Sequence, residues 1–406
     1  MMRFPDKFLW GAATSAHQVE GNNTNSDWWH WEQRGGGKAP SAGACSHYER
    51  YREDFDLAGS LGHTCHRLSV EWSRIEPRQG EFSAEAIAHY KDVIAALRER
   101  SIEPVVTLHH FTSPQWFAEQ NGCACPRAAD HFPAYVNRIV SELAGSVTYW
   151  VTINEPLIYV FYGYIVGDWP PNVRSLPKAL AARNNFLRSH VRAYRLIHAI
   201  YEKRGLPRPK VSIAHHMPAY TACTGSIRDR LGVRLRNAIV NHNILGILAR
   251  RRTLDYIGVN YYSRTLVHAD SWSMRDLVCN ACSHHDDTLA KNSLGWEIYP
   301  QGIYDILMML NRYRLPVFIL ENGICTPDDS VRWDFIREHL SRVHAAIQNG
   351  IAVIGYAYWS FMDNFEWDKG FDPRFGLIGI DYRTGARTVR DSARKYSKVC
   401  STNQLE

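Results

Sequence analysis

The sequence lacks any long uninterrupted hydrophobic run, since no stretch approaches the roughly 18 apolar residues that a membrane-spanning helix needs. The N-terminal stretch 1–7 lacks the apolar core of a signal peptide. No Gly-rich phosphate-binding turn follows an early strand-like run, and we find no internal repeat or low-complexity tract. We therefore predict no membrane span and a cytoplasmic location.

Cysteine is scarce and scattered, with an odd total of nine. This pattern favours reduced thiols over a disulfide framework. Cys279 and Cys282, followed by the histidine pair 284–285, have a spacing that would suit a zinc site. A single such pair is weak support, so a plain reduced loop is favoured, as it is for Cys123 and Cys125. We predict no metal and no cofactor.

A broad charge imbalance is also missing. The formal net charge is +6, and residues 226–252, with seven arginines and one acid, hold a surplus of the same size. The remainder is balanced, which argues against a nucleic-acid partner. Two interpretations of this segment stay open: a trimmed, solvated barrel helix, or an arginine-rimmed apolar groove for an amphipathic anionic ligand, an anionic surface or a second subunit. Its apolar stripe consists of Leu231, Leu235, Ile239 and Ile244.

Strand-like runs alternate with helical stretches eight times along the chain. Residues 83–100 show helical spacing of apolar residues with Ser83 as a plausible N-cap, and further helices are predicted near 131–144, 178–204, 300–313 and 331–349. This alternation predicts one (β/α)₈ TIM barrel over residues 1–406, with the site at the carboxyl ends of the strands. The predicted strands are 8–13, 64–70, 104–109, 147–153, 210–214, 255–260, 316–320 and 352–358.

Two of these runs end in a carboxylate. An apolar run over 316–320 leads into Glu321, and the run 147–153 leads into Asn154 and Glu155. Two carboxyl groups at strand ends of one barrel are suited to a general acid and a nucleophile acting on one glycosidic bond. Each residue alone could be a buried polar group with a partner, but their joint placement favours catalysis.

The other strand ends carry polar and aromatic side chains suited to sugar hydroxyls and rings. Arg67, on the second strand, is a permanent cation that could keep a carboxylate ionised. One of the adjacent histidines 109 and 110 should point inward, more often as a satisfied polar group than as a metal ligand. Further candidates are Gln18, Asn260, Tyr262, Trp359, Glu366 and Trp367.

With these motifs the sequence resembles the family 1 glycoside hydrolases, of the β-glucosidase and β-galactosidase type. The resemblance covers the chain from Phe8 to Tyr396. Its most specific motifs are Thr152-Ile153-Asn154-Glu155-Pro156, Glu321-Asn322-Gly323, and Trp359-Ser360 through Glu366-Trp367.

The resemblance implies a retaining reaction with Glu155 as acid/base and Glu321 as nucleophile. It implies that Arg67, Asn260 and Tyr262 support the nucleophile, and that Trp296 forms a wall of the aglycone side. The residues that it implies bind the sugar are Gln18, His110, Asn154, Trp359, Glu366 and Trp367. Leu320 stands where the family often has Thr, and the segment between the fifth and sixth strands is shorter than usual.

We therefore expect a retaining β-glycosidase that acts on terminal β-D-glucosides, galactosides or fucosides. The sequence does not rank these sugars, because either orientation of the 4-hydroxyl can reach Gln18 and Glu366. The carboxylate of Glu366 would repel a 6-phosphate, so phosphosugars are not expected. Transglycosylation by the same mechanism is an alternative, and a non-catalytic glycan-binding barrel is disfavoured because both glutamates are present.

Overall fold

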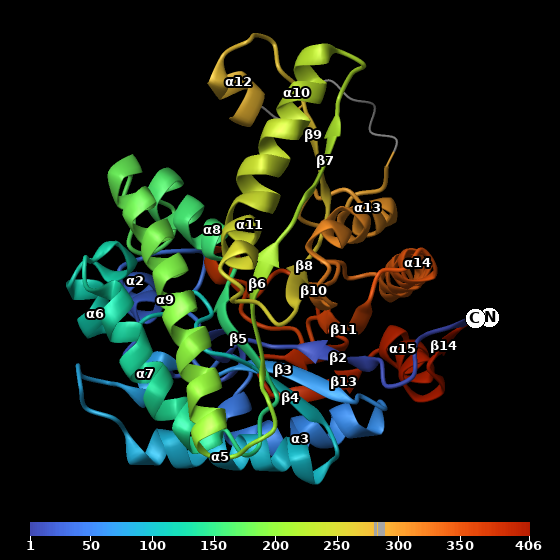
Figure 1. Cartoon of the computed structure of the whole chain (residues 1–406). Helices are drawn as coiled ribbons and strands as arrows, with labels where there is room; N and C mark the ends of the chain where they lie inside the picture. Colours follow the sequence, from blue (N-terminus) through green and yellow to red (C-terminus); the bar gives the residue numbers. More distant parts are fainter. Residues whose placement is uncertain (280–281, 283–288) are drawn as a thin grey trace.

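The computed structural model describes residues 1–279, 282 and 289–406 and is built around a closed barrel of parallel strands (Figure 1). Neighbouring strands follow the chain order around the barrel, and the last, β11, closes on the first, β2. The barrel strands are β2 (Leu9–Ala13), β3 (Cys65–Ser69), β4 (Glu103–Thr107), β5 (Tyr149–Asn154), β6 (Lys210–His216), β8 (Ile257–Asn260), β10 (Val317–Asn322) and β11 (Val353–Trp359).

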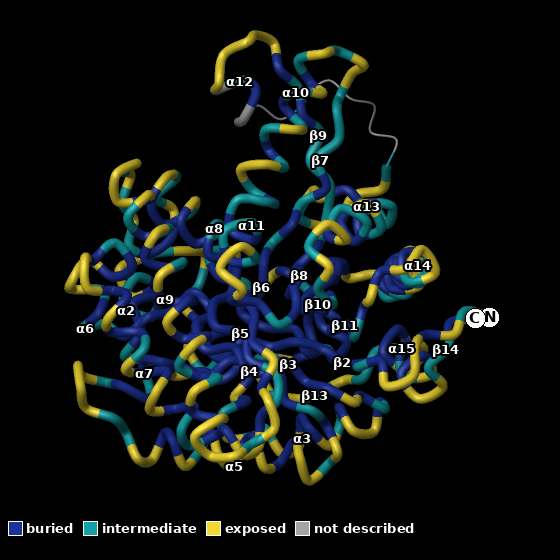
Figure 2. The backbone as a smooth tube through the Cα atoms, viewed as in Figure 1, coloured by how far each residue is buried: buried dark blue, intermediate teal, exposed yellow. Residues whose placement is uncertain are grey.

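These strands lie within a residue or two of the predicted runs, and the predicted TIM barrel is confirmed. All six residues of β10 are buried, and the barrel strands form the buried centre of the molecule (Figure 2). A parallel strand covered on both faces is usually rich in apolar residues, as β10 is before Glu321, although β3 also buries His66 and Arg67.

Helices surround the barrel and alternate with its strands. The predicted helix at 83–100 is α5 (Ala84–Glu99), where the Ser83 hydroxyl accepts from the Ala86 amide at 3.1 Å. The four other predicted helices are α7 (Ala128–Leu143), α9 (Leu176–Lys203), α13 (Pro300–Leu310) and α14 (Asp329–Gln348).

Shorter elements complete the cover of the barrel. Further helices around the barrel are α1 (Ala16–Val19), α2 (Asp27–Gln33), α3 (His47–Ser60), α4 (Trp72–Ile75), α6 (Gln115–Glu119), α8 (Pro156–Val160), α15 (Asp391–Thr402), η1 (Gly122–Ala124), η2 (Phe161–Val166), η4 (Asn311–Tyr313) and η5 (Trp367–Lys369). Two small antiparallel pairs lie near the termini: β1 (Met2–Arg3) with β14 (Gln404–Leu405), and β12 (Ile378–Asp381) with β13 (Ala386–Val389). The two chain ends therefore meet (Figure 1).

A lobe projects beyond the barrel after β6 (Figure 1). It consists of β7 (Ala219–Ala222), β9 (Arg264–Val267), α10 (Ile227–Arg236) and α12 (Met274–Cys279). β7 and β9 pair in parallel, and α10 packs against both strands and α12. Gly232 permits this packing, because a Cβ atom there would lie 2.8 Å from a Val267 methyl carbon. The assignment of residues 1–406 to a single domain stays a prediction.

The arginine-rich segment is longer than a trimmed barrel helix, and most of its arginines are exposed. α10 continues through η3 (Asn237–His242) into α11 (Asn243–Arg250). Of this continuous segment, only the second half, which contains α11, covers the barrel. Arg236, in contrast, is buried and donates to the Leu277 carbonyl at 3.1 Å. Along such a helix, Arg236 and Arg250 lie about 20 Å apart. The arginines therefore sit at two ends of the segment rather than around one groove.

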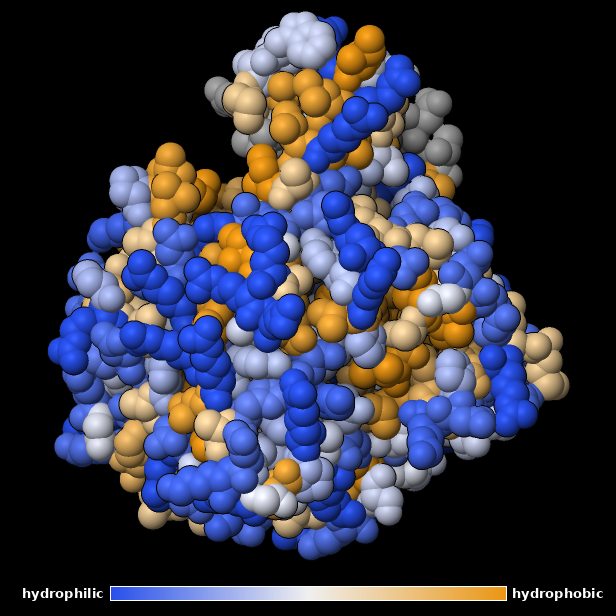
Figure 3. Space-filling view, viewed as in Figure 1, coloured by the Kyte–Doolittle hydropathy of each residue, from blue (hydrophilic) through white to orange (hydrophobic). Residues whose placement is uncertain are grey.

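The apolar stripe of this segment is buried unevenly. Ile244 is buried, whereas Leu231 and Leu235 are half-buried and Ile239 is exposed. Hydrophobic surface also lies beside hydrophilic side chains on the lobe (Figure 3), where Ile227 and Trp272 are exposed. Binding of an amphipathic anionic ligand or of a second subunit at 226–252 stays a prediction.

The expectation of reduced thiols is wrong for one pair. Cys223 and Cys282 form a disulfide that ties the end of β7 to the segment after α12. The backbone explains the pairing, because the amides of Cys223 and Cys282 donate to Val267 and Leu266 on β9. Cys282 is therefore unavailable as the zinc ligand considered above. The side chain of Cys279 and the histidine pair 284–285 lie outside the described residues. No helix among the described residues is long and apolar enough to cross a membrane.

Candidate active site

The carboxyl ends of four neighbouring strands bring polar side chains together. Asn154 on β5 pairs with Ala214 on β6, and Asn260 on β8 pairs both with His216 on β6 and with Glu321 on β10. Gly323, just after β10, lets the ends of β10 and β11 approach, because a Cβ atom there would lie 1.7 Å from the Trp359 carbonyl oxygen. Both predicted carboxylates therefore face one region of the barrel mouth.

A cavity of about 300 Å³ opens at this end of the barrel. It contains both carboxylates and much aromatic surface, which suits a ligand with hydroxyl groups and flat apolar faces. Its lining consists of His110, Phe111, Asn154, Glu155, Ile158, Tyr162, Trp169, His216, Tyr262, Leu294, Trp296, Glu321, Trp359, Glu366, Trp367, Asp368, Lys369 and Phe375. A second cavity of about 420 Å³ shares Tyr162, His216, Tyr262 and Trp296 with the first and reaches the lobe.

Glu321 is held by two donors. The Arg67 guanidinium donates to Oε1, and the Tyr262 hydroxyl donates to Oε2. Glu321 is almost fully buried and Arg67 is completely buried, so little water screens this ion pair. Both contacts stabilise the carboxylate and orient its two oxygens.

Glu155 turns out of β5 through an unusual backbone conformation. Its φ of 41° and ψ of 57° are left-handed, and Pro156 then starts α8. Its amide donates to the Ala214 carbonyl at 2.8 Å, and Asn260 Nδ2 donates to Oε1 at 2.6 Å. Phe111 and Trp367, which line the same cavity, also have positive φ. Strained backbone of this kind concentrates at functional sites.

The two carboxyl groups influence each other's protonation. Burial raises the pKa of Glu321 to about 7, with a further upward contribution from the charge of Glu155, although Arg67 and Tyr262 lower it. Burial also raises the pKa of Glu155, but His216, Asn260 and Arg67 outweigh it, so the net direction is downward. A general acid would be expected to have a raised pKa, so the downward direction differs from the role that the resemblance implies for Glu155. Because the two groups interact closely, they titrate as a pair that can share one proton.

Asn154 connects the two carboxyl groups. Its Oδ1 accepts from Arg67 at 2.7 Å and from Asn260 at 3.2 Å, while its Nδ2 donates to His110 Nε2 at 3.1 Å. Arg67 also contacts Glu321, and Asn260 also contacts Glu155. A single hydrogen-bonded network therefore fixes the relative positions of both carboxylates.

The segment after β11 forms the opposite wall. Trp359 Nε1 donates to Glu366 Oε1 at 3.3 Å, and Trp367 stacks near His110 with ring centroids 6.1 Å apart. Burial raises the pKa of Glu366 well above its usual value. Gln18 lies behind this wall, where it donates to the Phe365 carbonyl at 2.8 Å and accepts from Ser15. It thereby positions the segment that carries Glu366.

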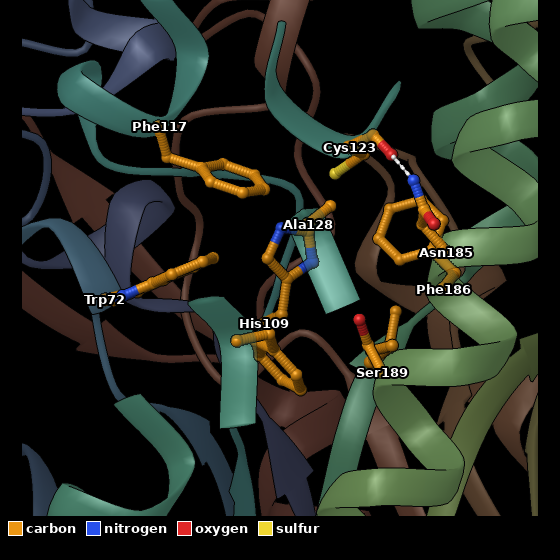
Figure 4. A pocket seen from close by; sticks show the side chains of 10 residues that line it. Trp72, His109, Phe117, Cys123, Ala128, Asn185, Phe186 and Ser189 are labelled. Atoms are coloured by element: carbon orange, nitrogen blue, oxygen red, sulfur yellow. Dashed lines mark hydrogen bonds between the residues drawn. The ribbon is translucent and has the colours of Figure 1, made fainter. Parts of the chain in front are cut away.

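The adjacent histidines separate as expected. His110 faces the large cavity, whereas His109 lines an internal cavity of about 20 Å³, large enough for about one water molecule (Figure 4). Asn185 donates to the carbonyl of Cys123 at this cavity and to that of Cys125, and both thiols are buried. These two cysteines therefore belong to the packing around the site.

Most of the predicted site residues line the large cavity, and Arg67, Asn260 and Gln18 lie directly behind it. Trp296 is 41% exposed and lies 5.8 Å from Tyr262 between ring centroids. The prediction missed Tyr162, which lies in η2, and Trp169 and Phe375, which lie on connecting segments without a periodic pattern. It also missed His216, which lies two residues after the predicted strand 210–214, as Glu155 lies two residues after the predicted strand 147–153.

A parallel barrel with paired carboxyl groups and aromatic walls at its mouth has the arrangement of a glycosidase. A family model described as glycosyl hydrolase family 1 matches residues 1–244 and 226–405, and these stretches overlap within the arginine-rich segment. The chain is 30% identical to β-glucosidase A of Thermotoga maritima over 451 aligned residues, which cover 100% of this chain and 99% of the relative.

Two solved structures agree with this likeness. A β-glycosidase from Pyrococcus horikoshii superimposes with a TM-score of 0.92 and 38% identity, over 100% of this chain and 96% of the other. A β-glucosidase from Thermotoga maritima in complex with glucoimidazole gives a TM-score of 0.92 and 31% identity, over 99% and 100%. The chain therefore belongs to glycosyl hydrolase family 1 and is a β-glucosidase-like glycoside hydrolase.

Proposed function

We propose that this enzyme hydrolyses terminal β-D-glucosides, galactosides or fucosides with retention of configuration. The observation that carries the proposal is the network in which Arg67 and Asn260, joined by Asn154, hold Glu321 and Glu155 at one cavity. A retaining glycosidase needs two carboxyl groups close together, one to bond the anomeric carbon and one to protonate the leaving oxygen.

In the first step Glu321 is the nucleophile. Its carboxylate forms a bond to C1 of the sugar while the bond from C1 to the aglycone oxygen breaks. Arg67 and Tyr262 keep this carboxylate ionised and aligned. Glu155 transfers its proton to the departing oxygen, so the aglycone leaves as a neutral alcohol.

In the second step the roles reverse. Glu155, now a carboxylate, takes a proton from water while the water oxygen bonds to C1 and Glu321 leaves. The reactive form carries one proton on the pair, with Glu155 protonated and Glu321 ionised. Without substrate the raised pKa of Glu321 and the lowered pKa of Glu155 favour the proton on Glu321, so the proton must move to Glu155 before the first step. Because Glu321 has a pKa of about 7 in the empty cavity, a bell-shaped pH dependence is expected.

The sugar is held by the polar groups around the pair. Asn154 and His110 are placed to bind hydroxyl groups on one side, and Glu366 accepts from the 4- and 6-hydroxyls on the other. Trp359 and Trp367 supply apolar surface for the ring face. The second cavity, beyond Trp296, gives room for the aglycone.

The test separates the two carboxyl groups by amide substitution. Glu321→Gln should abolish turnover of every aryl β-glycoside while the protein stays folded, as thermal unfolding can verify. Glu155→Gln should still release 2,4-dinitrophenolate, which needs no proton, and azide should restore turnover by attacking the glycosyl-enzyme. The released sugar azide should be the β-anomer. Recovery of the α-anomer, or turnover by Glu321→Gln, would show that these assignments are wrong.

A further inference from the structure

His216 stands next to Glu155 in a position that the proposed reaction has not used. It is the last residue of β6, and its neighbours on the two flanking strands carry the acid/base machinery. Its backbone pairs with Asn260, which donates to Glu155, and Ala214 on the same strand accepts from the Glu155 amide. The ring lies against Tyr262, with centroids 6.1 Å apart and planes inclined by 28°. Strand β6 therefore fixes both Glu155 and the ring beside it.

The Nδ1 atom of His216 faces the carboxyl group. It is buried and has no hydrogen-bond partner in the described part of the chain, and it lies 3.6 Å from Glu155 Oε1. A buried polar atom without a partner is costly, so such atoms usually serve a purpose. The distance is slightly too long for a hydrogen bond but would become one after a small movement of either side chain.

The charge on Glu155 changes during the reaction. It starts as a neutral acid and becomes a carboxylate as its proton passes to the leaving oxygen. A donor that contacts the carboxylate more strongly than the neutral acid lowers the barrier, because it stabilises the transition state more than the ground state. Asn260 already donates to Oε1, so a second donor there leaves the other oxygen to carry the transferred proton.

We propose that His216 is a positioning residue for Glu155, whose Nδ1–H closes on Oε1 as the acid ionises. The proposal rests on the proposed function and identifies a further residue that sets the strength of the acid. The direction of the Glu155 pKa, which His216 lowers, agrees with it. The charged and titratable groups around Glu155 and His216 come from five parts of the chain. They are Arg67 from β3, Glu321 from β10, His215 from β6, and Tyr262 and Glu366 from the segments after β8 and β11.

These neighbours do not replace His216. His215 points away, since its Nε2 lies 2.9 Å from the Val240 carbonyl oxygen, and burial lowers its pKa to about 4. Burial and Glu321 raise the pKa of Tyr262 well above its usual value, so that hydroxyl stays neutral. Arg67 donates to Glu321 and Asn154. His216 is thus suited to respond to the charge of Glu155.

Two substitutions separate the donor from the ring. His216→Phe keeps a flat ring against Tyr262 but removes the donor. His216→Asn keeps an uncharged N–H donor close to the position of Nδ1. Values of kcat/KM are measured against pH for aryl β-glucosides or β-galactosides with leaving groups of graded acidity, and folding is checked by thermal unfolding.

For His216→Phe we expect the basic limb of the pH profile to move upward, because Glu155 loses a partner of its carboxylate and keeps its proton longer. The value of kcat/KM should fall about tenfold for poor leaving groups, because His216 contributes only part of the rate enhancement that a general acid supplies. The 2,4-dinitrophenyl substrate, which needs no acid, should change less than about twofold. His216→Asn should recover most of the loss.

An equal loss for all leaving groups, with an unmoved basic limb, would overturn the proposal and leave His216 a packing residue. If His216→Phe fails to fold, His216→Asn still decides. The proposal then requires that the ratio of kcat/KM between good and poor leaving groups in His216→Asn stays within about threefold of the wild-type ratio. A larger change contradicts the proposal. Failure of the proposed function is distinguishable, because the wild-type enzyme itself would then not cleave aryl β-glycosides.

Discussion

Glu366 combines a charged group with a cavity wall that disfavours charge. Burial raises its pKa well above the usual value, although Trp359, which donates at 3.3 Å, and Gln18 oppose this shift. Sugar hydroxyls that donate to Glu366 would stabilise its carboxylate and lower this pKa. Binding should therefore release a proton, and affinity should rise with pH between the pKa values of the bound and the empty states.

The measurement uses glucose or galactose and the fluorescence of the cavity tryptophans. A Glu321→Gln background removes the other cavity-lining carboxyl group whose pKa is raised. In that background the affinity for the sugar should rise with pH. The double variant Glu321→Gln/Glu366→Gln should bind the sugar with an affinity that does not change with pH. Its binding should also be about tenfold or more weaker, because hydrogen bonds to a charged group are lost. An equal pH dependence in the double variant would exclude Glu366 as the titrating group.

At the residue scale, the sequence identified the groups that directly follow apolar strands. Glu321 and Glu155 are recognisable because each ends such a run just before a strand-breaking residue. His216 also ends a strand, but it follows His215, and the sequence does not show which of two adjacent rings faces the site. Its importance depends on a contact with Glu155 across 61 positions of the chain, which no local pattern encodes.

At the element scale, the barrel strands were predictable and the lobe was not. Strands buried on both faces are rich in apolar residues, whereas β9 is mostly half-buried and pairs with β7 outside the barrel. The helix α10 shows the same helical periodicity as a barrel helix, although it packs on the lobe. The disulfide was missed because cysteine spacing does not reveal pairing across 59 positions.

The disulfide should stabilise the lobe and leave the barrel chemistry unaffected. Cys223→Ser/Cys282→Ser should destabilise the lobe by about 2–4 kcal/mol, the usual contribution of a disulfide. Proteolytic cleavage in the lobe should therefore accelerate, while turnover of small aryl glycosides, bound at the barrel mouth, stays near the wild-type value. Limited proteolysis followed by mass spectrometry measures the first effect.

Reductant provides the matched control for this prediction. It should sensitise the wild-type lobe to protease and make two further thiols reactive, but it should not change the double variant. Equal protease resistance of the wild type and the double variant, each with and without reductant, would contradict a stabilising role for Cys223 and Cys282.

At the scale of the whole molecule, contacts between the two ends of the chain complete the fold. β1 pairs with β14, and β2 pairs with β11 to close the barrel. Asp54 on α3 adds a buried ion pair with Arg387 on β13, at 2.8 Å, and a contact with His47 at 2.7 Å. Asp54 and Arg387 are 333 positions apart in the chain, so their ion pair forms only when both ends of the chain are in place.

Asp54 should therefore make folding stability depend on pH. Burial alone would raise its pKa, but the hydrogen bonds from His47 and Arg387 lower it to about 2, below the usual 3.8. A lowered pKa stabilises the fold above pH 4, and this contribution is lost as the pH falls from 4 towards 2.

Asp54→Asn removes the charge and leaves Arg387 buried without its carboxylate, so the variant should lose about 3–5 kcal/mol of folding stability at pH 7. Denaturant unfolding at pH 7, 5 and 3 should show the difference from the wild type shrinking at the lowest pH. Asp372→Asn, at a side chain 85% exposed, should show little loss at any pH. A constant difference between wild type and Asp54→Asn across this range would mean that the Asp54 charge does not contribute to stability through Arg387 and His47.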